Sequence, residues 1–366
     1  MMHQIMLVSA IFSWVLALMA LVNLRTMVRP LKTDPPEVLE SVEILIPARN
    51  EQSTIASCVT CALAQTRIFD LKVTVLDDGS SDDTLAELNK IVDKRLKVLP
   101  GDEELPKGWL GKPWACARLA AQSKAEYLVF IDADVDLNVD AVAHGIEMMH
   151  RANLSLISPY PKQLAQTILT RLIQPLLQWS WLSTVVLSIA RTTKRSSLAV
   201  ANGQFLICRR SDYELVGGHS SAADQVLDDI MLLRSFYKAG LTGTVADGTR
   251  LATCHMYETD RELVDGYSKS LWRAFNGIVG SVFTNALLFI VYTLPLYGLL
   301  TQDWLLALLA LIGASYGRWI VAVRTGQHRI PDVFTHGLAI AVFVGLNIFS
   351  WLKHLLGRNT WKGRSV

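Results

Sequence analysis

Carboxylate side chains follow three separate apolar runs near the start of the chain. Glu51 comes soon after the first run, Asp77-Asp78 directly follows the second, and Asp132-Ala133-Asp134 directly follows the third. Carboxylates that lie close together repel each other, and their pKa values rise, unless a cation neutralises them. Mg²⁺ and Mn²⁺ are hard cations that prefer oxygen ligands, and Mg²⁺ commonly bridges a carboxylate to substrate phosphates. The pattern therefore favours a divalent ion that holds a nucleotide diphosphate.

Alternating strand and helix patterns predict how these acids are positioned. Apolar β-rich runs occupy residues 42–47, 71–76, 96–99 and 127–131, and helix-like segments occupy 51–65, 82–93 and 112–123. Such alternation is typical of an α/β fold whose strands pair in parallel through right-handed crossovers. Ligands of these sheets bind at the carboxyl ends of the strands, where the three acidic segments fall. We therefore predict a Rossmann-like, mostly parallel sheet with a ligand site at one edge.

The three motifs resemble the opening of the family 2 glycosyltransferases, which have the GT-A fold. They read ILIPARNE, VLDDGSSDDT and FIDADV, and the resemblance covers residues 41–260. The apolar flanks and the later segments CHMY and GYSKSLWRAF are similar to a membrane-bound bacterial subgroup that glycosylates lipids, including carotenoid- and hopanoid-associated members. The resemblance implies a metal-dependent, inverting transfer of one hexose from a nucleotide sugar, with UDP as the expected nucleotide, to a hydroxyl of a membrane lipid.

The resemblance also implies roles for individual residues. Those expected to bind the nucleotide sugar are Ala48, Arg49, Glu51, Asp78, Lys112, Asp132 and Asp134. Gly203 and Gly218 correspond to positions on the acceptor or sugar side, and residues 202–205 correspond to a strand that floors the acceptor side. Mn²⁺ or Mg²⁺ is expected on Asp134, with His255 as a second candidate ligand. A purely structural role for His255 stays open.

The catalytic pair implied by the resemblance is Asp228-Asp229, which opens a helix-like segment. Asp229 is the expected general base for the acceptor hydroxyl. The alternative is that both acids only stabilise the helix, because negative charge in a first turn favours the helix dipole.

One segment departs from the family pattern. Processive members carry Q/R-x-x-R-W on an interfacial helix, whereas residues 269–273 read KSLWR, so the order of Arg and Trp is reversed. A processive polysaccharide synthase is therefore an alternative that the sequence disfavours. A non-catalytic scaffold with a relic fold is another, although the chain keeps all the motif acids. A nucleotidyltransferase would need a glycine-rich basic signature near the first strand, which this sequence lacks.

Apolar segments at both ends predict an integral membrane protein. The chain of 366 residues is 51% hydrophobic and only 19% charged, and the excess of apolar residues lies at its two ends. Residues 4–23 carry no charge and are long enough to span a bilayer, as are the runs 282–300, 304–323 and 333–352. Basic residues follow the first run, which places that side in the cytoplasm. Arg318 within the third run must snorkel or face a protein interior.

The membrane topology and one internal segment stay open at this point. Three crossings after a cytoplasmic domain would put the basic tail outside, so one C-terminal run is expected to be re-entrant or interfacial. Residues 164–190 have apolar side chains at helical spacing, interrupted by Pro175, with Gln174 and Gln178 off the apolar face. This pattern favours a helix in the plane of the interface, with a buried core helix and a true span as alternatives.

These inferences give a division of the chain and a location. The expected segments are an anchor (1–28), a nucleotide-sugar-binding half (41–160), an interfacial segment (161–195), an acceptor half (196–260), an interfacial helix (261–280), transmembrane helices (281–352) and a basic tail (353–366). We expect the bacterial inner membrane, with the catalytic domain in the cytoplasm. The partners are a nucleotide sugar, a lipid acceptor and the bilayer. With a net charge of +2 and no basic stripe, nucleic acid is not an expected partner.

Overall fold

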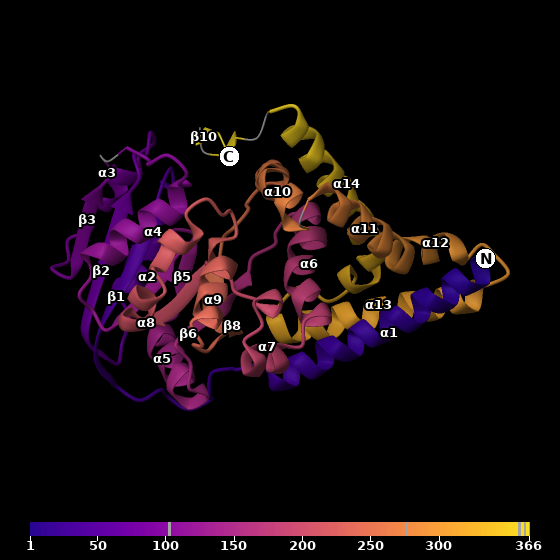
Figure 1. Cartoon of the computed structure of the whole chain (residues 1–366), viewed down its shortest axis with the longest axis horizontal. Coiled ribbons are helices and arrows are strands. Elements are labelled where there is room, and N and C mark those ends of the chain that lie inside the picture. Colours follow the sequence, from indigo (N-terminus) through magenta and orange to yellow (C-terminus); the bar gives the residue numbers. More distant parts are fainter. Residues whose placement is uncertain (102–103, 276, 358–359, 362–363, 366) are drawn as a thin grey trace. The chain divides into compact units, whose positions relative to one another are not determined.

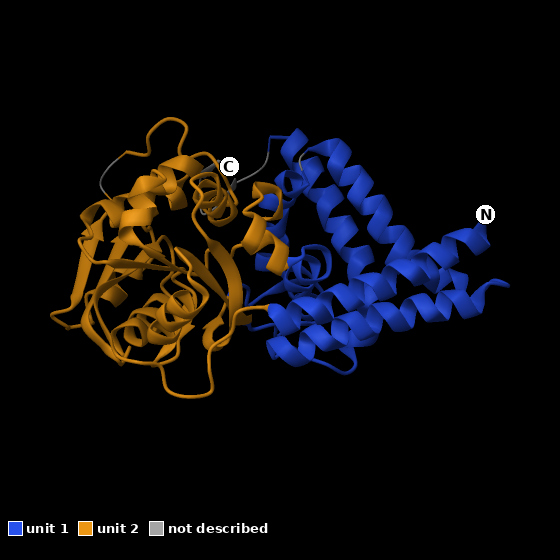
Figure 2. Ribbon diagram, turned by 60° about the horizontal axis from the view of Figure 1, so that its bottom comes forward, with its two compact units in different colours: residues 1–26, 163–186, 256–366 blue, residues 27–162, 187–255 orange. Residues whose placement is uncertain are grey.

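The computed structural model describes residues 1–101, 104–275, 277–357, 360–361 and 364–365. These residues form two compact units, shown in different colours in Figure 2. Unit 1 comprises residues 1–26, 163–186 and 256–366, and unit 2 comprises residues 27–162 and 187–255. Arg358 and Lys362 of the predicted basic tail lie outside the described residues.

Unit 2 is built on one eight-stranded sheet, with the strand order β3-β2-β1-β4-β7-β6-β8-β5 (Figure 1). The strands are β1 (Val38–Ala48), β2 (Ile68–Asp77), β3 (Leu96–Pro100), β4 (Tyr127–Ile131), β5 (Val135–Leu137), β6 (Leu156–Gln163), β7 (Phe205–Arg209) and β8 (Gly243–Cys254). β1 pairs in parallel with β2 and β4, and β2 pairs in parallel with β3. β7 is antiparallel to β4 and β6, and β5 is antiparallel to β8. The predicted α/β fold is confirmed, and the four predicted strands are its parallel part.

Helices of unit 2 cover this sheet. They are α2 (Ile55–Leu63), α3 (Thr84–Leu88), α4 (Gly111–Gln122), α5 (Ala141–Ala152), α7 (Leu187–Thr193), α8 (Arg210–Leu215) and α9 (Asp228–Lys238). α4 shows why such segments fold as helices, because Ala115, Cys116 and Leu119 lie on one face and enter a core formed with strand residues such as Leu45 and Leu128.

Two local predictions were wrong in extent. The helix expected over 82–93 ends at Leu88, because Leu88 is buried whereas Val92, one turn later, is 96% exposed and has no core to enter. The strand expected over 202–205 begins only at Phe205. There the Asn202 side chain accepts a hydrogen bond from the Gln204 backbone N–H at 2.7 Å, which holds these residues in a turn.

Unit 1 is helical apart from an antiparallel pair of short strands, β9 (Thr360–Trp361) and β10 (Arg364–Ser365). Its helical elements are α1 (Met2–Thr26), α6 (Ile168–Thr184), α10 (Asp260–Ala274), α11 (Ile278–Leu288), the π-helical turn η3 (Phe289–Thr293), α12 (Leu294–Gly298), α13 (Trp304–Thr325), the short turn η4 (Asp332–Thr335) and α14 (His336–Leu355). Four helices in the described part of the chain are long and apolar enough to cross a membrane, namely Met2–Thr26, Ile278–Gly298, Trp304–Thr325 and Asp332–Leu355. They coincide with the four apolar runs of the sequence.

Small side chains allow α1 and α13 to approach closely. A Cβ atom added to Gly313 would lie 3.1 Å from Ser13, and one added to Gly317 would lie 3.3 Å from Ala17. The two glycines are four residues apart, and so are Ser13 and Ala17, so both pairs recur at one-turn spacing along the two helices. Close packing of small residues is a main source of helix association in lipid, where the hydrophobic effect between helices is weak.

The polar side of α6 is buried within unit 1. Gln174 and Gln178 are each 2% exposed, whereas Ile168, expected on the apolar face, is 78% exposed. α6 packs against α1, α13 and α14, all of them helices of the same unit. The sequence predicted an apolar face and an outward polar face on this helix. α6 does not show that separation, because its glutamines are buried and Ile168 is exposed.

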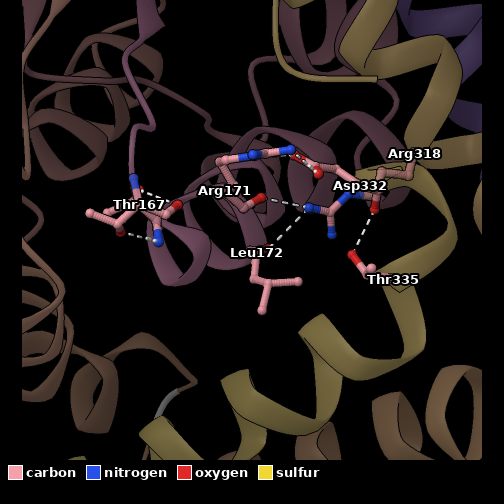
Figure 3. Close-up of polar contacts among 7 residues, drawn as sticks. Thr167, Arg171, Leu172, Arg318, Asp332 and Thr335 are labelled. Carbon is pink, nitrogen blue, oxygen red and sulfur yellow. Dashed lines mark hydrogen bonds and ion pairs between the residues drawn. The ribbon is translucent and has the colours of Figure 1, made fainter. Parts of the chain in front are cut away.

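Pro175 and Arg318 complement each other inside unit 1. Pro175 has no backbone N–H, so the Arg171 carbonyl four residues earlier lacks its helical donor. The Arg318 guanidinium from α13 supplies one, since Nη2 donates to the Arg171 oxygen at 2.8 Å and to the Leu172 oxygen at 3.2 Å (Figure 3). Arg318 is 3% exposed. Of the two expected placements, it faces the protein interior.

This complementarity predicts a coupling between the two positions. Arg318→Met should lower the free energy of unfolding by roughly 1–3 kcal/mol, because it leaves a buried carbonyl without a donor. In the background Pro175→Ala, which restores a backbone N–H at position 175, the same substitution should cost measurably less. Unfolding of the purified full-length chain in detergent, measured as a double-mutant cycle, tests this. Additive losses would show that Arg318 does not replace the missing donor.

Candidate functional site

Two of the three acidic motifs meet where β1 and β2 end side by side. Ala48 is paired with Asp77 in the sheet, and the Asp78 N–H donates to the Ala48 oxygen at 2.8 Å. Arg49 Nη1 donates to the Asp78 carbonyl at 2.5 Å and lies 4.0 Å from its carboxylate. The Asp78 side chain is nearly buried, whereas Arg49 is partly open to solvent. Arg49 and Asp78 therefore form an ion pair at the carboxyl ends of these strands.

Hydrogen bonds between the loops after β1 and β2 hold this edge together. The Glu51 N–H donates to Thr84 Oγ1 at 2.8 Å, the Asn50 N–H donates to Ser80 Oγ at 2.9 Å, and the Asn50 side chain accepts from the Ser81 N–H at 2.8 Å. Several residues of the VLDDGSSDDT motif thus have positioning roles. They fix the backbone from which Glu51 and Asp78 project.

A second group of predicted residues lines one small cavity beyond β4. Its walls are formed by Pro47, Lys112, Cys116, Phe130, Ile131, Asp132, Gly203, Leu206, His219, Asp228 and Asp229. Lys112 at the start of α4 pairs with Asp132 at 2.5 Å, and the Asp132 N–H donates to the Gln204 oxygen at 3.2 Å. Although burial disfavours its charge, Asp132 and Asp228 hold the pKa of Lys112 well above its usual range. Lys112 is therefore the cation around which these acids gather.

Gly203 brings the backbone against the Asp229 carboxylate. Its N–H donates to Asp229 Oδ2 at 2.7 Å, and the Ile230 N–H donates to Oδ1 at 2.7 Å. A Cβ atom at position 203 would lie 3.3 Å from Lys112 Nζ and 3.5 Å from Asp229 Cβ. A larger residue there would crowd both side chains.

The environment of Asp229 makes it a weaker acid than an ordinary carboxyl. Burial raises its pKa to about 7, and the neighbouring Asp228 charge adds to the rise. The Lys112 charge and the two backbone donors oppose the shift but do not cancel it. A carboxylate with a pKa near the working pH can both accept and release a proton, which is what a general base requires.

Tyr213 and His219 were missed as a pair by the sequence reasoning. His219 Nε2 lies 3.8 Å from Asp228 Oδ2, while the Tyr213 hydroxyl lies 2.7 Å from His219 Nδ1 and accepts from the His219 N–H at 3.0 Å. Burial, with a smaller contribution from Lys112, lowers the pKa of His219 to about 3, so the ring is neutral.

Gly218 does not line the cavity. It has a φ of +52°, and a Cβ there would lie 2.3 Å from the Tyr213 ring.

Asp134 and His255 meet through the pairing of β5 with β8. Val135 is paired with Cys254, and the His255 N–H donates to the Asp134 carbonyl at 2.8 Å. The His255 ring, however, faces Asp136, with 3.2 Å between Nε2 and Oδ2. No group of three or more His, Cys, Asp or Glu side chains in the described part of the chain could hold a metal by itself. This fits the mode in which Mg²⁺ takes one or two carboxylates and completes its shell with water and substrate phosphates.

The predicted site residues thus fall into three neighbouring groups in unit 2. Lys269 and Arg273, from the segment that departs from the family pattern, lie on α10 in unit 1, where the Arg273 guanidinium lies over the Trp272 ring at 4.6 Å. The signal for His219 was present in the Gly217-Gly218-His219 run, but no spacing pattern pointed to Tyr213.

Comparisons with known proteins agree with this arrangement. Residues 43–216 match the family model described as glycosyl transferase family 2. The 4,4'-diaponeurosporenoate glycosyltransferase of Staphylococcus haemolyticus (strain JCSC1435) is 27% identical over 242 residues, which span 64% of this chain and 62% of that protein. The protein of the same description from Staphylococcus aureus (strain MRSA252) is 24% identical over 345 residues, which span 89% of this chain and 88% of that one.

A solved structure shares the fold over nearly the whole chain. It is the mannosyltransferase PcManGT from Pyrobaculum calidifontis in complex with GDP-Man and Mn²⁺, with a TM-score of 0.53 and 16% identity, covering 97% of this chain and 99% of that one. At this identity the likeness concerns the fold alone. Residues 43–216 therefore carry a glycosyl transferase family 2 domain, and the chain combines a GT-A fold with apolar helices in its N- and C-terminal regions.

Proposed function

We propose that the protein moves a single hexose from a nucleotide sugar, UDP-linked, to a hydroxyl of a membrane lipid at the cytoplasmic face of the bacterial inner membrane. The observation that carries the proposal is the Asp229 carboxylate, partly buried at the cavity wall beside Lys112 and Asp132. The lipid acceptor is supported by the four apolar helices and by the relatives, which are named as 4,4'-diaponeurosporenoate glycosyltransferases.

The donor would lie along the carboxyl ends of β1, β2 and β4. Arg49, Glu51 and Asp78, which lie together at the ends of β1 and β2, would bind the nucleoside, and Lys112 would meet the diphosphate. The carboxylate of Asp134 has the oxygen ligands that Mn²⁺ or Mg²⁺ prefers, and His255 lies beside it. A divalent ion held there would stabilise the negative charge of the departing diphosphate.

Asp229 would act on the acceptor. Its oxygens are oriented by the Gly203 and Ile230 N–H groups, so the carboxylate keeps one position while it takes the hydroxyl proton. Asp228 lies beside His219, and its charge helps to keep the pKa of Asp229 high. One displacement on the face opposite the leaving group inverts the anomeric carbon. In this proposal, residues 161–195 and 261–280 lie at the level of the lipid head groups.

The decisive experiment identifies the product. Membranes that contain the protein are incubated with labelled nucleotide sugars, and the labelled lipid is isolated and sized. We expect one sugar per lipid. Labelled polymer of increasing length would instead indicate a processive polysaccharide synthase, and the absence of label from every donor would favour the non-catalytic scaffold.

The first prediction concerns the base. Asp229→Asn should lower the turnover number by roughly 10²–10⁴-fold, because the amide cannot accept the proton. Membrane content should stay close to wild type and thermal unfolding should shift only modestly, since the amide oxygen can still accept one of the two backbone hydrogen bonds. Asp224→Asn, at an exposed acid four residues before Asp228, is the matched control. Wild-type turnover in Asp229→Asn would remove the base assignment.

The second prediction concerns pH. Because only deprotonated Asp229 can accept the proton, kcat/KM should rise with pH through a midpoint near 7 and fall away on the acid side. Asp228→Asn removes a charge that raises this pKa, so the acid limb should move to lower pH in that variant. A pH profile with the same acid midpoint in both proteins would contradict this account.

The third prediction concerns the metal. Chelation of divalent ions should abolish transfer, and added Mn²⁺ or Mg²⁺ should restore it. Asp134→Ala should lose activity without recovering it on addition of either ion, because its carboxylate is the expected ligand. The measurement is labelled-lipid formation together with donor binding by calorimetry. Transfer that is unaffected by chelation would point to a metal-independent site.

A further inference from the structure

A buried polar stripe in unit 1 takes no part in the proposed transfer. Arg171, Gln174 and Gln178 occur at positions i, i+3 and i+7 of α6, so they share one side of the helix. Both glutamines are 2% exposed. The Gln174 amide nitrogen and oxygen, and the Gln178 oxygen, have no hydrogen-bond partner among the residues that the structure describes. Burying an amide group without a hydrogen bond costs folding free energy, and this cost is larger in a unit whose helices are apolar enough to cross a bilayer.

Arginine side chains bring surplus positive charge to this stripe. Arg171 forms a two-pronged ion pair with Asp332, at 2.8 Å from Nε and 2.5 Å from Nη2 (Figure 3). Arg318 adds a second guanidinium from α13 that also interacts electrostatically with Asp332, so two arginines share one aspartate. Arg318 Nη2 donates hydrogen bonds to two carbonyls, but its buried Nη1 has no hydrogen-bond partner within the described ranges. One aspartate for two arginines leaves a net positive charge beside the buried Arg318, and burial disfavours such a charge, so the arrangement favours binding of an anion.

The approach to this charge is apolar. The Arg171 and Asp332 side chains are 29% and 11% exposed, so the ion pair lies where the cluster opens toward the surface of unit 1. Ile330 and Phe334, two residues before and after Asp332, are 75% and 69% exposed. A ligand at this opening would meet exposed apolar side chains first and the guanidinium groups behind them. A long-chain amphiphile with a negative head has this distribution of chemistry.

We propose that Arg171, Arg318 and Gln174 form a binding site in unit 1 for the oxyanion head group, a carboxylate or a phosphate, of a single membrane amphiphile. The head group accepts from Arg318 Nη1 and from the Gln174 amide, and the chain lies against Phe334 and Ile330. The occupied site balances the charges of Arg171, Arg318 and Asp332. This inference does not depend on the proposed transfer reaction.

The test uses the full-length chain, purified in a non-ionic detergent and stripped of lipid. Oleate supplies a carboxylate, lysophosphatidate supplies a phosphate, and oleyl alcohol supplies the same chain without charge. Native mass spectrometry and thermal unfolding should show a one-to-one complex and a raised midpoint with oleate, with lysophosphatidate, or with both, and neither effect with the alcohol. The stronger of the two anions identifies the head group. Equal binding of the alcohol, or no binding of either anion, overturns the proposal.

Two variants locate the site. Gln174→Leu should weaken binding of the anion at least fivefold while the ligand-free protein unfolds no earlier than wild type, because it replaces an unpaired amide with an apolar group. Arg318→Gln should abolish binding. Thr325→Val is the matched control on α13, since the Thr325 hydroxyl is already bonded to the Val321 carbonyl at 3.0 Å. Undiminished binding by Gln174→Leu, which does not depend on the folding of the Arg318 variant, would exclude this site.

Discussion

One ammonium group among three carboxylates organises the cavity of unit 2. Lys112 pairs with Asp132, lies beside Gly203 and Asp229, and also feels the charge of Asp228. These groups come from three separate elements, the start of α4, the end of β4 and the start of α9. A single charged group would be unstable in this partly buried position. Lys112 and the acids neutralise one another, and this links the sheet to both helices. The weak acidity of Asp229 is a result of the same balance.

In unit 1 the constraint is different, because its polar groups lie among apolar helices and must find hydrogen-bond partners within the unit. Pro175 removes a backbone donor from α6, and a charged side chain from another helix replaces it. Small residues on α1 and α13 allow close approach, and side chains such as Ser9 and Asn23 donate to carbonyls of neighbouring segments. Polar groups here serve the packing of helices first. The surplus at Arg318 is the exception from which the anion site is inferred.

Local pattern was sufficient for the parallel half of the sheet and for the apolar helices. The runs ending at Ile131 and near Asp77 are continuous and apolar, and each is followed by polar loop residues, so their strand ends and acids could be placed in advance. The antiparallel half could not, because the pairing of β7 with β4 depends on contacts between residues far apart in the chain, such as Phe130 and Leu206, which are 76 positions apart. The Tyr213–His219 contact and the Arg318 donor also arise only from tertiary proximity.

The first helix has a consequence for how this protein can be handled. α1 is an integral part of the packing of unit 1, since Asn23 Nδ2 donates to the Leu182 and Val185 carbonyls and Ala17 lies against Gly317. A leucine-rich signal-anchor from another protein could insert into the bilayer, but its side chains would be too bulky to pack against Gly313 and Gly317 of α13. Removing residues 2–26 to obtain a water-soluble enzyme would therefore uncover the small-residue face of α13 and invite aggregation.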